Sequence, residues 1–593
     1  MFEKVLVANR GEIAIRVMRA LREMGIGSVA VYSEIDRDAP HVREADEAFL
    51  LGPAAPAESY LNVEKILDVA DSAGAEAIHP GYGFLAENAP FAKACEKAKV
   101  TFIGPPAKAI EAMGSKTEAR AIMDKAGVPI VPGAIAPVAD VAEAKKQAKE
   151  IGYPIACKAA GGGGGKGFRV AAKEKDLEEA FEGAAREGEK FFSDSTVYLE
   201  RYLEDPRHVE VQVLADSKGN VIHLGERDCS IQRRHQKLIE EAPGPQVDAE
   251  MRERIGKIAT EAAAAVGYRS AGTVEGLQVG EDYFFLEMNT RVQVEHCVTE
   301  MVTGFDIVRE QIRIAAGEKL SISQDEVELR GHAIECRINA EAAHKNFAPA
   351  PGQITSYREP AGPGVRVDSG VEAGSEVTPM YDPMVAKLIV WDLDRELATA
   401  RMLRALDEYE VGGLTTLIPF HKAILDTKQW ANGETCRDLT EDKKWLKGLA
   451  ADDVAYGGLP SSEPPGDVAG VQQRQYQVEV GGKLFDVKVI GDAGTSATAG
   501  GGPGLKKPPK RERAAGGGGS SAASEDLVSP LQGNVFKVPV EQGQQVSQGD
   551  LVCVIEAMKM ENEITAHKSG KLTELAVAEG AAVNAGDLLA KIE

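Results

Sequence analysis

The 593-residue sequence has few cysteines, and none is placed for pairing or for metal binding. Its seven cysteines are scattered and no two form a Cys-x-x-Cys pair, which argues against a zinc site and a disulfide framework and favours a reducing compartment. The N-terminus has no signal-peptide or transit-peptide pattern, and no apolar run approaches the roughly 20 residues that span a bilayer. These absences predict a cytoplasmic protein without a membrane partner.

Basic residues are also scarce. The chain has 68 Lys and Arg against 92 Asp and Glu, a formal net charge of -24. This charge argues against nonspecific binding to nucleic acid or to anionic lipid. A nucleotide remains possible, because it needs only a local positive pocket. The length exceeds that of one hydrophobic core and predicts roughly three to five domains.

The beginning of the chain alternates strand-like and helix-like segments. Residues 4–8 predict a buried strand, residues 11–24 a helix with one apolar face, and residues 28–32 a second strand. A strand, a helix and a strand at this spacing predict a parallel βαβ unit. The alternation continues to residue 115, and segments that mix hairpins and helices follow it.

Five consecutive glycines, Gly161 to Gly165, follow a predicted strand over residues 155–158 that ends in Lys158. Such a run costs much conformational entropy, which close approach of backbone amides to phosphates would justify. The P-loop pattern does not fit, because Gly167 stands where that pattern needs Ser or Thr. We therefore predict a phosphate-binding loop, with a plain flexible loop as the alternative.

A carboxylate pair is predicted on a later hairpin. Residues 271–279 and 283–289 are strand-like, and a turn centred on Glu281 would place Glu275 opposite Glu287 and Thr273 opposite Asn289. Opposed carboxylates with Cβ atoms roughly 5 Å apart repel each other. A Mg²⁺ ion with phosphate oxygens would relieve that repulsion.

The alternative for this hairpin is a solvated polar face. Phe284, Leu286 and Met288 argue against it, because they mark the other face as buried. The same alternation is expected to carry Arg291, Gln293 and Glu295 to the metal side of the strand. A second basic cluster, from Gln232 to Lys237, would offset the charge of a triphosphate.

The C-terminal segment contains two copies of one short pattern. Gly543 recurs as Gly580 and Asp550 as Asp587, each 37 positions later. Two β halves of this kind would bury one small core and leave Lys559, which lies between them, on an exposed hairpin tip. A modifying enzyme could reach a lysine there, although an ordinary surface lysine is the alternative.

Two further segments precede this repeat. Residues 476–489 alternate polar and apolar side chains around Gly481-Gly482 and predict a β-hairpin. It is a candidate element for docking a partner, with a purely structural role as the alternative. Residues 494–524 consist mainly of Gly, Ala, Ser and Pro with a basic island, and predict a disordered linker.

Several motifs together resemble biotin carboxylase, an ATP-grasp enzyme, over residues 1–446. They are Asn9-Arg10-Gly11-Glu12-Ile13, His79-Pro80-Gly81-Tyr82-Gly83-Phe84, the glycine loop, Glu287-Met288-Asn289-Thr290-Arg291 and Glu335-Cys336-Arg337-Ile338. The segment Ala557-Met558-Lys559-Met560 resembles the modified site of biotin carrier domains. The whole chain is thus similar to the alpha subunit of an acyl-CoA carboxylase, in which biotin carboxylase and carrier are fused.

The resemblance implies a multidomain α/β fold that ends in an all-β domain. The expected units are a Rossmann-like pre-ATP-grasp domain at 1–115, an ATP-grasp domain at 116–330 with a lid at about 131–203, a biotin carboxylase C-terminal domain at 331–446, a connector at 447–493, the linker at 494–524, and a lipoyl-like biotinyl barrel at 525–593.

The resemblance also implies roles for particular residues. The ATP site would comprise Lys116, Lys158, Gly163, Gly164, Gly165, Glu200, Arg201, Leu203, His208, Gln232, His235, Glu275 and Glu287. Glu275, Glu287 and Asn289 would hold Mg²⁺, with Mn²⁺ as the alternative ion. Bicarbonate would contact Lys237, Arg291, Gln293 and Val294; the catalytic set would be Lys237, Arg291, Glu295 as base and Arg337 toward biotin.

By the same resemblance, the chain would use ATP and bicarbonate to carboxylate biotin on Lys559. Since no second active site is evident, carboxybiotin would pass to a separate carboxyltransferase (beta) subunit that acts on acetyl- or propionyl-CoA. Biotin protein ligase and a second copy of the chain are the other expected partners. The alternatives are the ATP-dependent subunit of a two-subunit pyruvate carboxylase and a non-catalytic carrier or scaffold.

In the carrier, Ser529-Pro530-Leu531-Gln532-Gly533 differs from the usual Pro-Met-Pro-Gly, which concerns docking. Two positions of the biotin carboxylase part also depart from the family pattern. Cys297 stands where the family usually has proline, which suggests a less rigid loop after Glu295. Gly276 replaces a bulky residue beside Glu275. Both departures concern packing more than chemistry.

Overall fold

A computed structural model of the chain describes residues 1–133, 137–159, 167–192, 194–234, 236–449, 471–480, 483–492, 526–529, 533–557, 560–578, 581–583 and 586–593. The glycine loop, His235, the predicted linker at 494–524 and Lys559 lie outside the described residues, as does the side chain of Lys116. Among the described residues, no helix combines the length and the apolar character needed to cross a bilayer.

The N-terminal unit confirms the predicted βαβ start. β1 (Lys4–Val7) pairs in parallel with β2 (Gly27–Ser33), and α1 (Gly11–Glu23) connects them. A five-stranded parallel sheet has the order β3-β2-β1-β4-β5, with β3 (Glu47–Gly52), β4 (Ala77–His79) and β5 (Thr101–Phe102). Val5 and Val7 pack into one core and Leu6 into another, which explains why β1 is apolar throughout.

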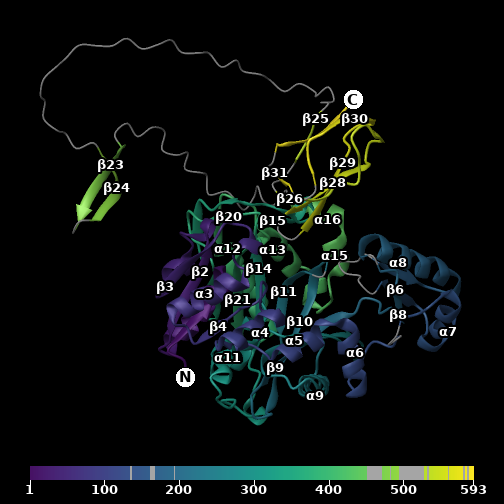
Figure 1. Cartoon of the computed structure of the whole chain (residues 1–593). Helices are drawn as coiled ribbons and strands as arrows, with labels where there is room; N and C mark the ends of the chain where they lie inside the picture. The colour runs from purple at the N-terminus through teal and green to yellow at the C-terminus, as the bar shows by residue number, and fades with distance from the viewer. Residues whose placement is uncertain are drawn as a thin grey trace, which may run out of the picture.

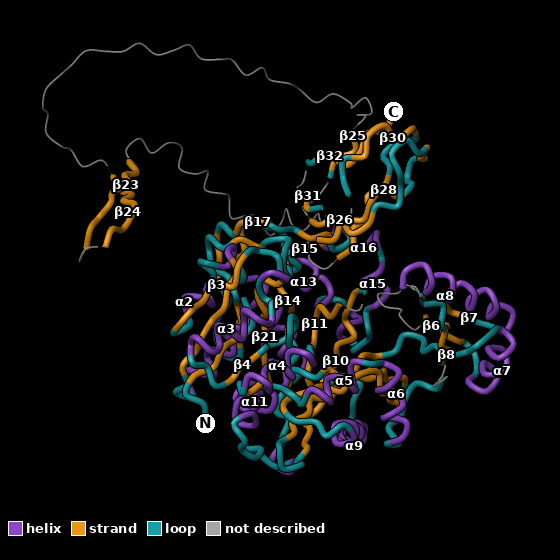
Figure 2. Tube along the Cα trace, viewed as in Figure 1, coloured by secondary structure: helices purple, strands orange, loops and turns teal. Residues whose placement is uncertain are grey.

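The largest sheet has eight strands, all antiparallel to their neighbours. Its order is β13-β12-β9-β10-β11-β14-β21-β19. The strands are β9 (Arg207–Ala215), β10 (Val221–Arg233), β11 (Gln236–Ala242), β12 (Ser270–Val279), β13 (Asp282–Asn289), β14 (His332–Asn339), β19 (Val365–Ser369) and β21 (Met384–Asp392). Of these, β10, β11, β14 and β21 lie in the middle of the main body in Figures 1 and 2. Because β11 pairs with β14, one sheet runs across the predicted boundary between residues 330 and 331.

Helices pack against the strands on both sides of the predicted boundary at residue 330. α9 (Ala249–Ala265) contacts β9 and β10, and α10 (His296–Thr303) contacts β10, β14 and β21. α12 (Arg395–Glu408) contacts β14 and β21. Other helices are α3 (Val63–Ala73), α4 (Ala89–Ala98), α5 (Ala107–Gly114), α6 (Lys116–Lys125), α11 (Ile307–Ala315), α13 (Ile418–Leu425), α14 (Lys428–Ala431), α15 (Arg437–Glu441) and α16 (Lys443–Gly448).

The predicted lid is a separate small unit that projects to one side of the body in Figure 1. Its sheet has the order β7-β6-β8, with β6 (Ile155–Ala159), β7 (Phe168–Ala171) and β8 (Val197–Arg201). α7 (Val141–Ile151) and α8 (Leu177–Phe192) complete a core of its own. β6 confirms the strand expected before the glycine loop.

The register of β12 and β13 confirms the predicted pairs, Glu275 with Glu287 and Thr273 with Asn289. The turn differs, since Val279 pairs with Asp282 and leaves two turn residues instead of three. A register shift between Glu275 and Gly276 compensates for this.

Two further expectations, both about β13, are wrong. Leu286 is 37% exposed whereas Phe285 is buried, because the bulge reverses the facing of the residues between it and the turn. The strand also ends at Asn289, so Arg291, Gln293 and Glu295 lie on the connection that leads into α10.

The C-terminal domain has two four-stranded sheets, β25-β32-β30-β27 and β29-β28-β26-β31, around one apolar core. β26 (Gly533–Lys537), β27 (Gln545–Val546) and β28 (Leu551–Ala557) recur 37 residues later as β30 (Gly570–Leu575), β31 (Ala582–Val583) and β32 (Leu588–Ile592). The sequence repeat is therefore a structural repeat. β25 (Asp526–Val528) and β29 (Met560–Thr565) complete the domain; Ala557 of β28 pairs with Met560 of β29, on either side of positions 558 and 559.

The hairpin predicted over residues 476–489 is confirmed and is longer than expected. β23 (Val471–Val480) pairs with β24 (Lys483–Asp492) in antiparallel register, with Tyr476 opposite Val487.

Candidate active site

The site lies on the polar face of the central sheet. On β9, Val209, Val211 and Val213 pack into the core beneath α9, so the alternate residues His208, Glu210 and Gln212 face the other way. β12 repeats this arrangement with Val274 in the core and Thr273 and Glu275 on the polar face. Alternation along the strands therefore assembles a buried polar surface from residues far apart in sequence.

Lys237 stands at the centre of this surface. Its Nζ donates to Glu210 Oε2 at 2.5 Å, to Glu275 Oε1 at 2.8 Å and to Glu295 Oε1 at 2.7 Å. Burial lowers the pKa of Lys237, but the three carboxylates outweigh burial and raise it well above its usual range. The ammonium group is therefore charged at any physiological pH.

Arg227 on β10 fixes the residues beneath Lys237. It is fully buried and donates to Glu210 Oε1 at 2.6 Å, to Gln212 Oε1 at 2.8 Å and to Gln293 Oε1 at 2.7 Å. Sequence analysis missed both Arg227 and Glu210. The alternation of polar and apolar residues from His208 to Val213 was the available signal for Glu210.

Glu295 joins two of the three predicted catalytic cations, Lys237 and Arg337. It immediately precedes α10, and its Oε2 accepts from Arg337 Nη2 at 2.9 Å while Oε1 accepts from Lys237. Burial alone would raise the pKa of Glu295, but Lys237, Arg337 and Arg227 hold it well below its usual range. The group is an ionised carboxylate that could accept a proton once these cations turn toward an anionic substrate.

Arg337 is held from a second side as well. Its Nε donates to Glu240 Oε1 at 2.6 Å. Arg337 thus lies between two carboxylates, and Glu240 is a further site residue that sequence analysis missed.

The predicted metal ligands come together at the edge of this surface. Asn289 Nδ2 donates to Glu275 Oε1 at 2.8 Å, and Glu287 lies across the strand pair from Glu275. Two carboxylates and an amide oxygen are a donor set that Mg²⁺ accepts, so these residues fit the ion. Gln293 also donates to Glu275 Oε1, at 2.6 Å.

Arg291 connects this edge to the N-terminal unit. Its Nη2 donates to Asn289 Oδ1 at 3.0 Å and its Nε to Glu87 Oε2 at 2.9 Å. His208 lies on the same edge, with Nε2 3.0 Å from Glu275 Oε2. Burial lowers the pKa of His208, but the Glu275 carboxylate outweighs burial and raises it.

The predicted nucleotide residues divide between the lid and the sheet. Lys158 of β6 forms an ion pair with Glu200 of β8, and both belong to the lid. Arg201 ends β8, Leu203 follows it, and Gln232 lies on β10 opposite Lys237.

A cavity of about 700 Å³ is lined in part by chain neighbours of two predicted contacts, Leu203 and His208. Asp205 and Arg207, which lie between Leu203 and His208 in the chain, line one side of it, and Cys436 and Arg437 line another. None of the predicted nucleotide contacts is among the described residues that line it. Sequence analysis did not single out residues 433–438, which line the cavity.

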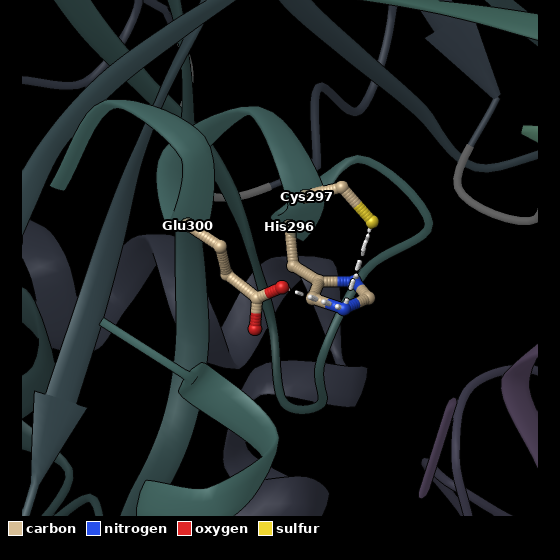
Figure 3. A group of neighbouring side chains, drawn as sticks. All are labelled: His296, Cys297 and Glu300. Carbon is tan, nitrogen blue, oxygen red and sulfur yellow. Dashed lines mark hydrogen bonds and ion pairs between the residues drawn. The ribbon is translucent and has the colours of Figure 1, made fainter. Parts of the chain in front are cut away.

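The segment after Glu295 is the first turn of α10, not the looser loop that Cys297 suggested. Figure 3 shows His296, Cys297 and Glu300 with their side chains converging, and one ligand atom of each lies within 4.8 Å of the others. Glu300, however, forms ion pairs with Arg16 and Arg366, both at 2.8 Å. These cations oppose a divalent metal, so the cluster is a buried structural network.

Protein-family comparisons cover most of the chain. The matching family models are "Biotin carboxylase, N-terminal domain" over residues 1–110, "Carbamoyl-phosphate synthase L chain, ATP binding domain" over 115–323, "Biotin carboxylase C-terminal domain" over 335–442 and "Biotin-requiring enzyme" over 525–592.

Individual relatives extend this similarity. The biotin-dependent acyl-coenzyme A carboxylase alpha3 subunit of Mycobacterium leprae is 48% identical over 100% of this chain and 98% of its own length. A pyruvate carboxylase subunit of Methanothermobacter thermautotrophicus is 57% identical over 73% of this chain and 88% of its own. The solved biotin carboxylase domain dimer of Hydrogenobacter thermophilus 2-oxoglutarate carboxylase, in complex with MgADP, ADP and bicarbonate, has a TM-score of 0.70 and 52% identity over 75% of this chain and 99% of that one.

Proposed function

Since this chain belongs to the biotin carboxylase family and carries a C-terminal biotinyl domain, we propose that it uses ATP and bicarbonate to carboxylate biotin attached to Lys559. The observation that carries the proposal is the Lys237 cluster, in which one ammonium group holds Glu210, Glu275 and Glu295 together. It brings the proposed base, a proposed metal ligand and a cation for the substrate into one buried site.

In this site, Glu295 accepts the proton of bicarbonate, whose oxygen then attacks the γ-phosphorus of ATP and releases ADP. Lys237 and Arg291 stabilise the negative charge of the transferring group. Mg²⁺, held by Glu275, Glu287 and Asn289, would neutralise phosphate charge. Closure of the lid would exclude water from the carboxyphosphate product.

Arg337 has the second proposed role. Its guanidinium faces Glu295 at 2.9 Å, so it can bind the ureido oxygen of biotin next to the bicarbonate site. Carboxyphosphate would break down to CO₂ and phosphate, and the phosphate would take the proton of the biotin ureido nitrogen. Arg337 would stabilise the resulting ureido anion, whose nitrogen then captures CO₂. The proposed contacts of ATP remain Lys116, Lys158, Glu200, Leu203, His208, Gln232 and His235.

Bicarbonate-dependent release of ADP with free biotin tests this function. Glu295→Gln and Arg337→Ala should each lower the biotin-dependent rate by roughly 10²- to 10³-fold, as losses of proton transfer and charge stabilisation do. Glu328→Gln and Arg330→Ala alter an exposed ion pair just before β14 and serve as matched controls. Full activity of either site variant would disprove its assigned role. A streptavidin blot of Lys559→Ala against the parent chain tests attachment of biotin by a biotin protein ligase.

A separate carboxyltransferase subunit is the proposed acceptor of the carboxyl group. The full-length match to an acyl-coenzyme A carboxylase alpha subunit favours an acyl-CoA as the final substrate, and acetyl- or propionyl-CoA is the proposed acceptor. A two-subunit pyruvate carboxylase is the second candidate, since the pyruvate carboxylase relative matches the biotin carboxylase part. Assaying the natively purified complex with each acceptor decides between them, and turnover of pyruvate alone would overturn the acyl-CoA assignment.

Two contacts of the chain with other proteins complete the proposal. The hairpin β23–β24 is a candidate docking element for the partner, so deletion of residues 476–489 should abolish copurification; a retained partner would refute this role.

The solved domain dimer of the Hydrogenobacter relative supports self-association through the biotin carboxylase part. Sedimentation velocity of residues 1–449 and of the full chain measures whether each is a dimer; a monomeric 1–449 would contradict self-association through this part.

A further inference from the structure

A row of buried ionisable side chains crosses the central sheet behind Arg337. Glu240 of β11 pairs with Glu335 of β14, and Arg337 of β14 pairs with Lys387 of β21. Residues opposed across strands share a face, as do residues two apart on one strand, so these four side chains lie on the same face. Glu240, Glu335 and Lys387 are fully buried.

Two carboxyl groups in this row are incompletely paired. Arg337 donates to Glu240 Oε1, but Glu240 Oε2 and both oxygens of Glu335 have no hydrogen-bond partner among the described residues. Opposed residues on antiparallel strands have Cβ atoms about 5 Å apart. Two ionised carboxylates so close together and shielded from water would repel strongly, and such a pair retains a proton.

We propose that Glu335 is a neutral carboxylic acid and that Glu240, the charged member of the pair, is a positioning residue that shares Arg337 with Glu295. Glu240 holds the guanidinium through Nε at 2.6 Å, and Glu295 holds it through Nη2 at 2.9 Å. With Glu335 neutral, the negative charge of the pair lies on Glu240, where it orients Arg337. The inference rests on the proposed role of Arg337 toward biotin.

The electrostatics of the row agree with this assignment. Burial raises the pKa of Glu335 well above its usual range; Glu240 and Glu295 add to the rise, and Lys387 and Arg337 oppose it. Burial also raises the pKa of Glu240 to about 7, with Glu295 adding and Arg337 and Lys237 opposing. Glu240 is thus charged above pH 7 and loses its hold on Arg337 below it.

The first test measures protonation without catalysis. Infrared spectra of the full chain at neutral pH should contain the C=O stretch of a buried carboxylic acid that Glu335→Gln removes. Glu335→Met, which is apolar and of similar length, should remove the same band and covers the case in which the amide disturbs folding. An unchanged band in both variants would show that Glu335 is ionised and would overturn the proposal.

The second test separates positioning from folding, in a Lys559→Ala background where added biotin is the only biotin. Glu240→Gln should lower the biotin-dependent kcat/KM by roughly tenfold to hundredfold, the usual worth of a hydrogen bond to a charged group. ADP release without biotin should fall by a smaller factor than the biotin-dependent rate, because Glu240 acts through Arg337 and does not contact the phosphates. Glu335→Gln replaces one neutral group by another and should leave both rates within twofold.

Glu341 provides a matched control, because it is buried and burial raises its pKa to about 7, but its partner is Asn339. Glu341→Gln should leave the biotin-dependent rate unchanged. An equal loss of both rates in Glu240→Gln, or no loss, would refute positioning. If Arg337→Ala also left the biotin-dependent rate intact, the proposed function of Arg337 would be the error instead.

The pH profile of the biotin-dependent kcat/KM completes the test. In the parent chain it should fall below an inflection near pH 7 as Glu240 gains a proton, and Glu240→Gln should lack that inflection. An identical inflection in the variant would assign the titration to another group and would overturn the role of Glu240.

Discussion

The floor of the site, meaning the polar face of β9, β10, β11, β12 and β14, differs from the lid in how it holds its charges. In the floor, the side chains of Arg227, Lys237 and Arg337 are 0%, 10% and 11% exposed, and each contacts at least two partners. In the lid, Arg169 and Arg186 are 53% and 68% exposed and have one carboxylate each.

This difference has a mechanical consequence. Buried charges are expensive to leave unpaired, so they fix the floor in one geometry. Exposed ion pairs contribute little, so the lid is held together by its apolar core of Ile155, Leu177 and Leu199. A rigid floor can hold reacting groups in position, while a unit with an apolar core of its own can move as one body, as the proposed lid closure requires.

Removing one buried floor cation should give the largest effect on stability. Arg227→Met removes the donor to Glu210 Oε1 and the donors to the side-chain oxygens of Gln212 and Gln293, at a cost of about 3–5 kcal/mol in the free energy of unfolding. Urea denaturation followed by circular dichroism measures it. Arg186→Ala in the lid removes an exposed pair and should not shift the midpoint. Equal shifts for the two would abolish the contrast between floor and lid.

Catalysis should show the same contrast on a smaller scale. Lys237→Met should lower bicarbonate-dependent ADP release by roughly 10²- to 10³-fold, because the cation that meets developing charge is lost. Lys158→Met in the lid should act mainly on the KM for ATP, with a smaller change in kcat. Steady-state kinetics at varied ATP separates the two parameters. A kcat defect in Lys158→Met as large as that of Lys237→Met would place the lid lysine in the chemical step.

Two buried histidines of the body should each contribute a loss of stability in acid that the lid lacks. Burial lowers the pKa of His41 and of His421 to about 4, whereas residues 131–203 contain no histidine. Because the unfolded state gains these protons near pH 6.5 and the folded state only near pH 4, the contribution of each histidine to stability should fall over that interval by about 1.4 kcal/mol per pH unit. Carboxyl groups with raised pKa values, such as Glu240 and Glu341, contribute with the opposite sign and are common to the parent chain and the histidine variants.

Urea midpoints from pH 7 to pH 5 measure this loss. His421→Gln should flatten the slope, and the same change at the partly exposed His344 is the control. Hydrogen exchange, corrected for intrinsic rates, should show the loss in β14 and α13 but not in α8. Parallel losses in the lid would mean that the two units unfold together.

How much of this could be predicted from sequence depends on how local each feature is. The comparisons confirm the predicted fold class, enzyme class and family, which follow from motifs within short stretches of chain. The pairing of Glu275 with Glu287 was predictable because a short turn fixes the register of its own hairpin. The assigned roles of the individual site residues stay predictions until the variants are measured.

Features that depend on sheet order were not predictable in this way. Arg227, Glu240 and Glu335 act through strands that are distant in sequence, and nothing in a single strand reveals that β11 lies beside β14. The exposure of Leu286 was also missed. The bulge opposite Glu275 and Gly276 reverses which face of the sheet each residue points to between the bulge and the turn. Alternation on β9 did mark its polar face, but not which cations would meet it.

The smallest predicted difference in stability between floor and lid concerns one buried glycine in each. A Cβ on Gly276 of β12 would lie 2.1 Å from the buried ring of Tyr283, which occupies the space above the glycine. Gly276→Ala should therefore destabilise the floor by about 1–3 kcal/mol through overpacking. Gly183 lies inside α8 of the lid, and its Cβ would meet only the Arg169 side chain at 3.5 Å. Gly183→Ala should stabilise the chain by about 0.5–1 kcal/mol, because alanine is the better helix former.

Urea denaturation of both variants checks the opposite signs. Tyr283→Leu provides the mechanism test, since it should cost stability alone yet recover part of the loss when it is combined with Gly276→Ala. Purely additive effects would show that the ring is not what excludes a side chain at residue 276. A destabilised Gly183→Ala would show that the lid is as tightly packed as the floor, and the proposed difference in rigidity would then need another origin.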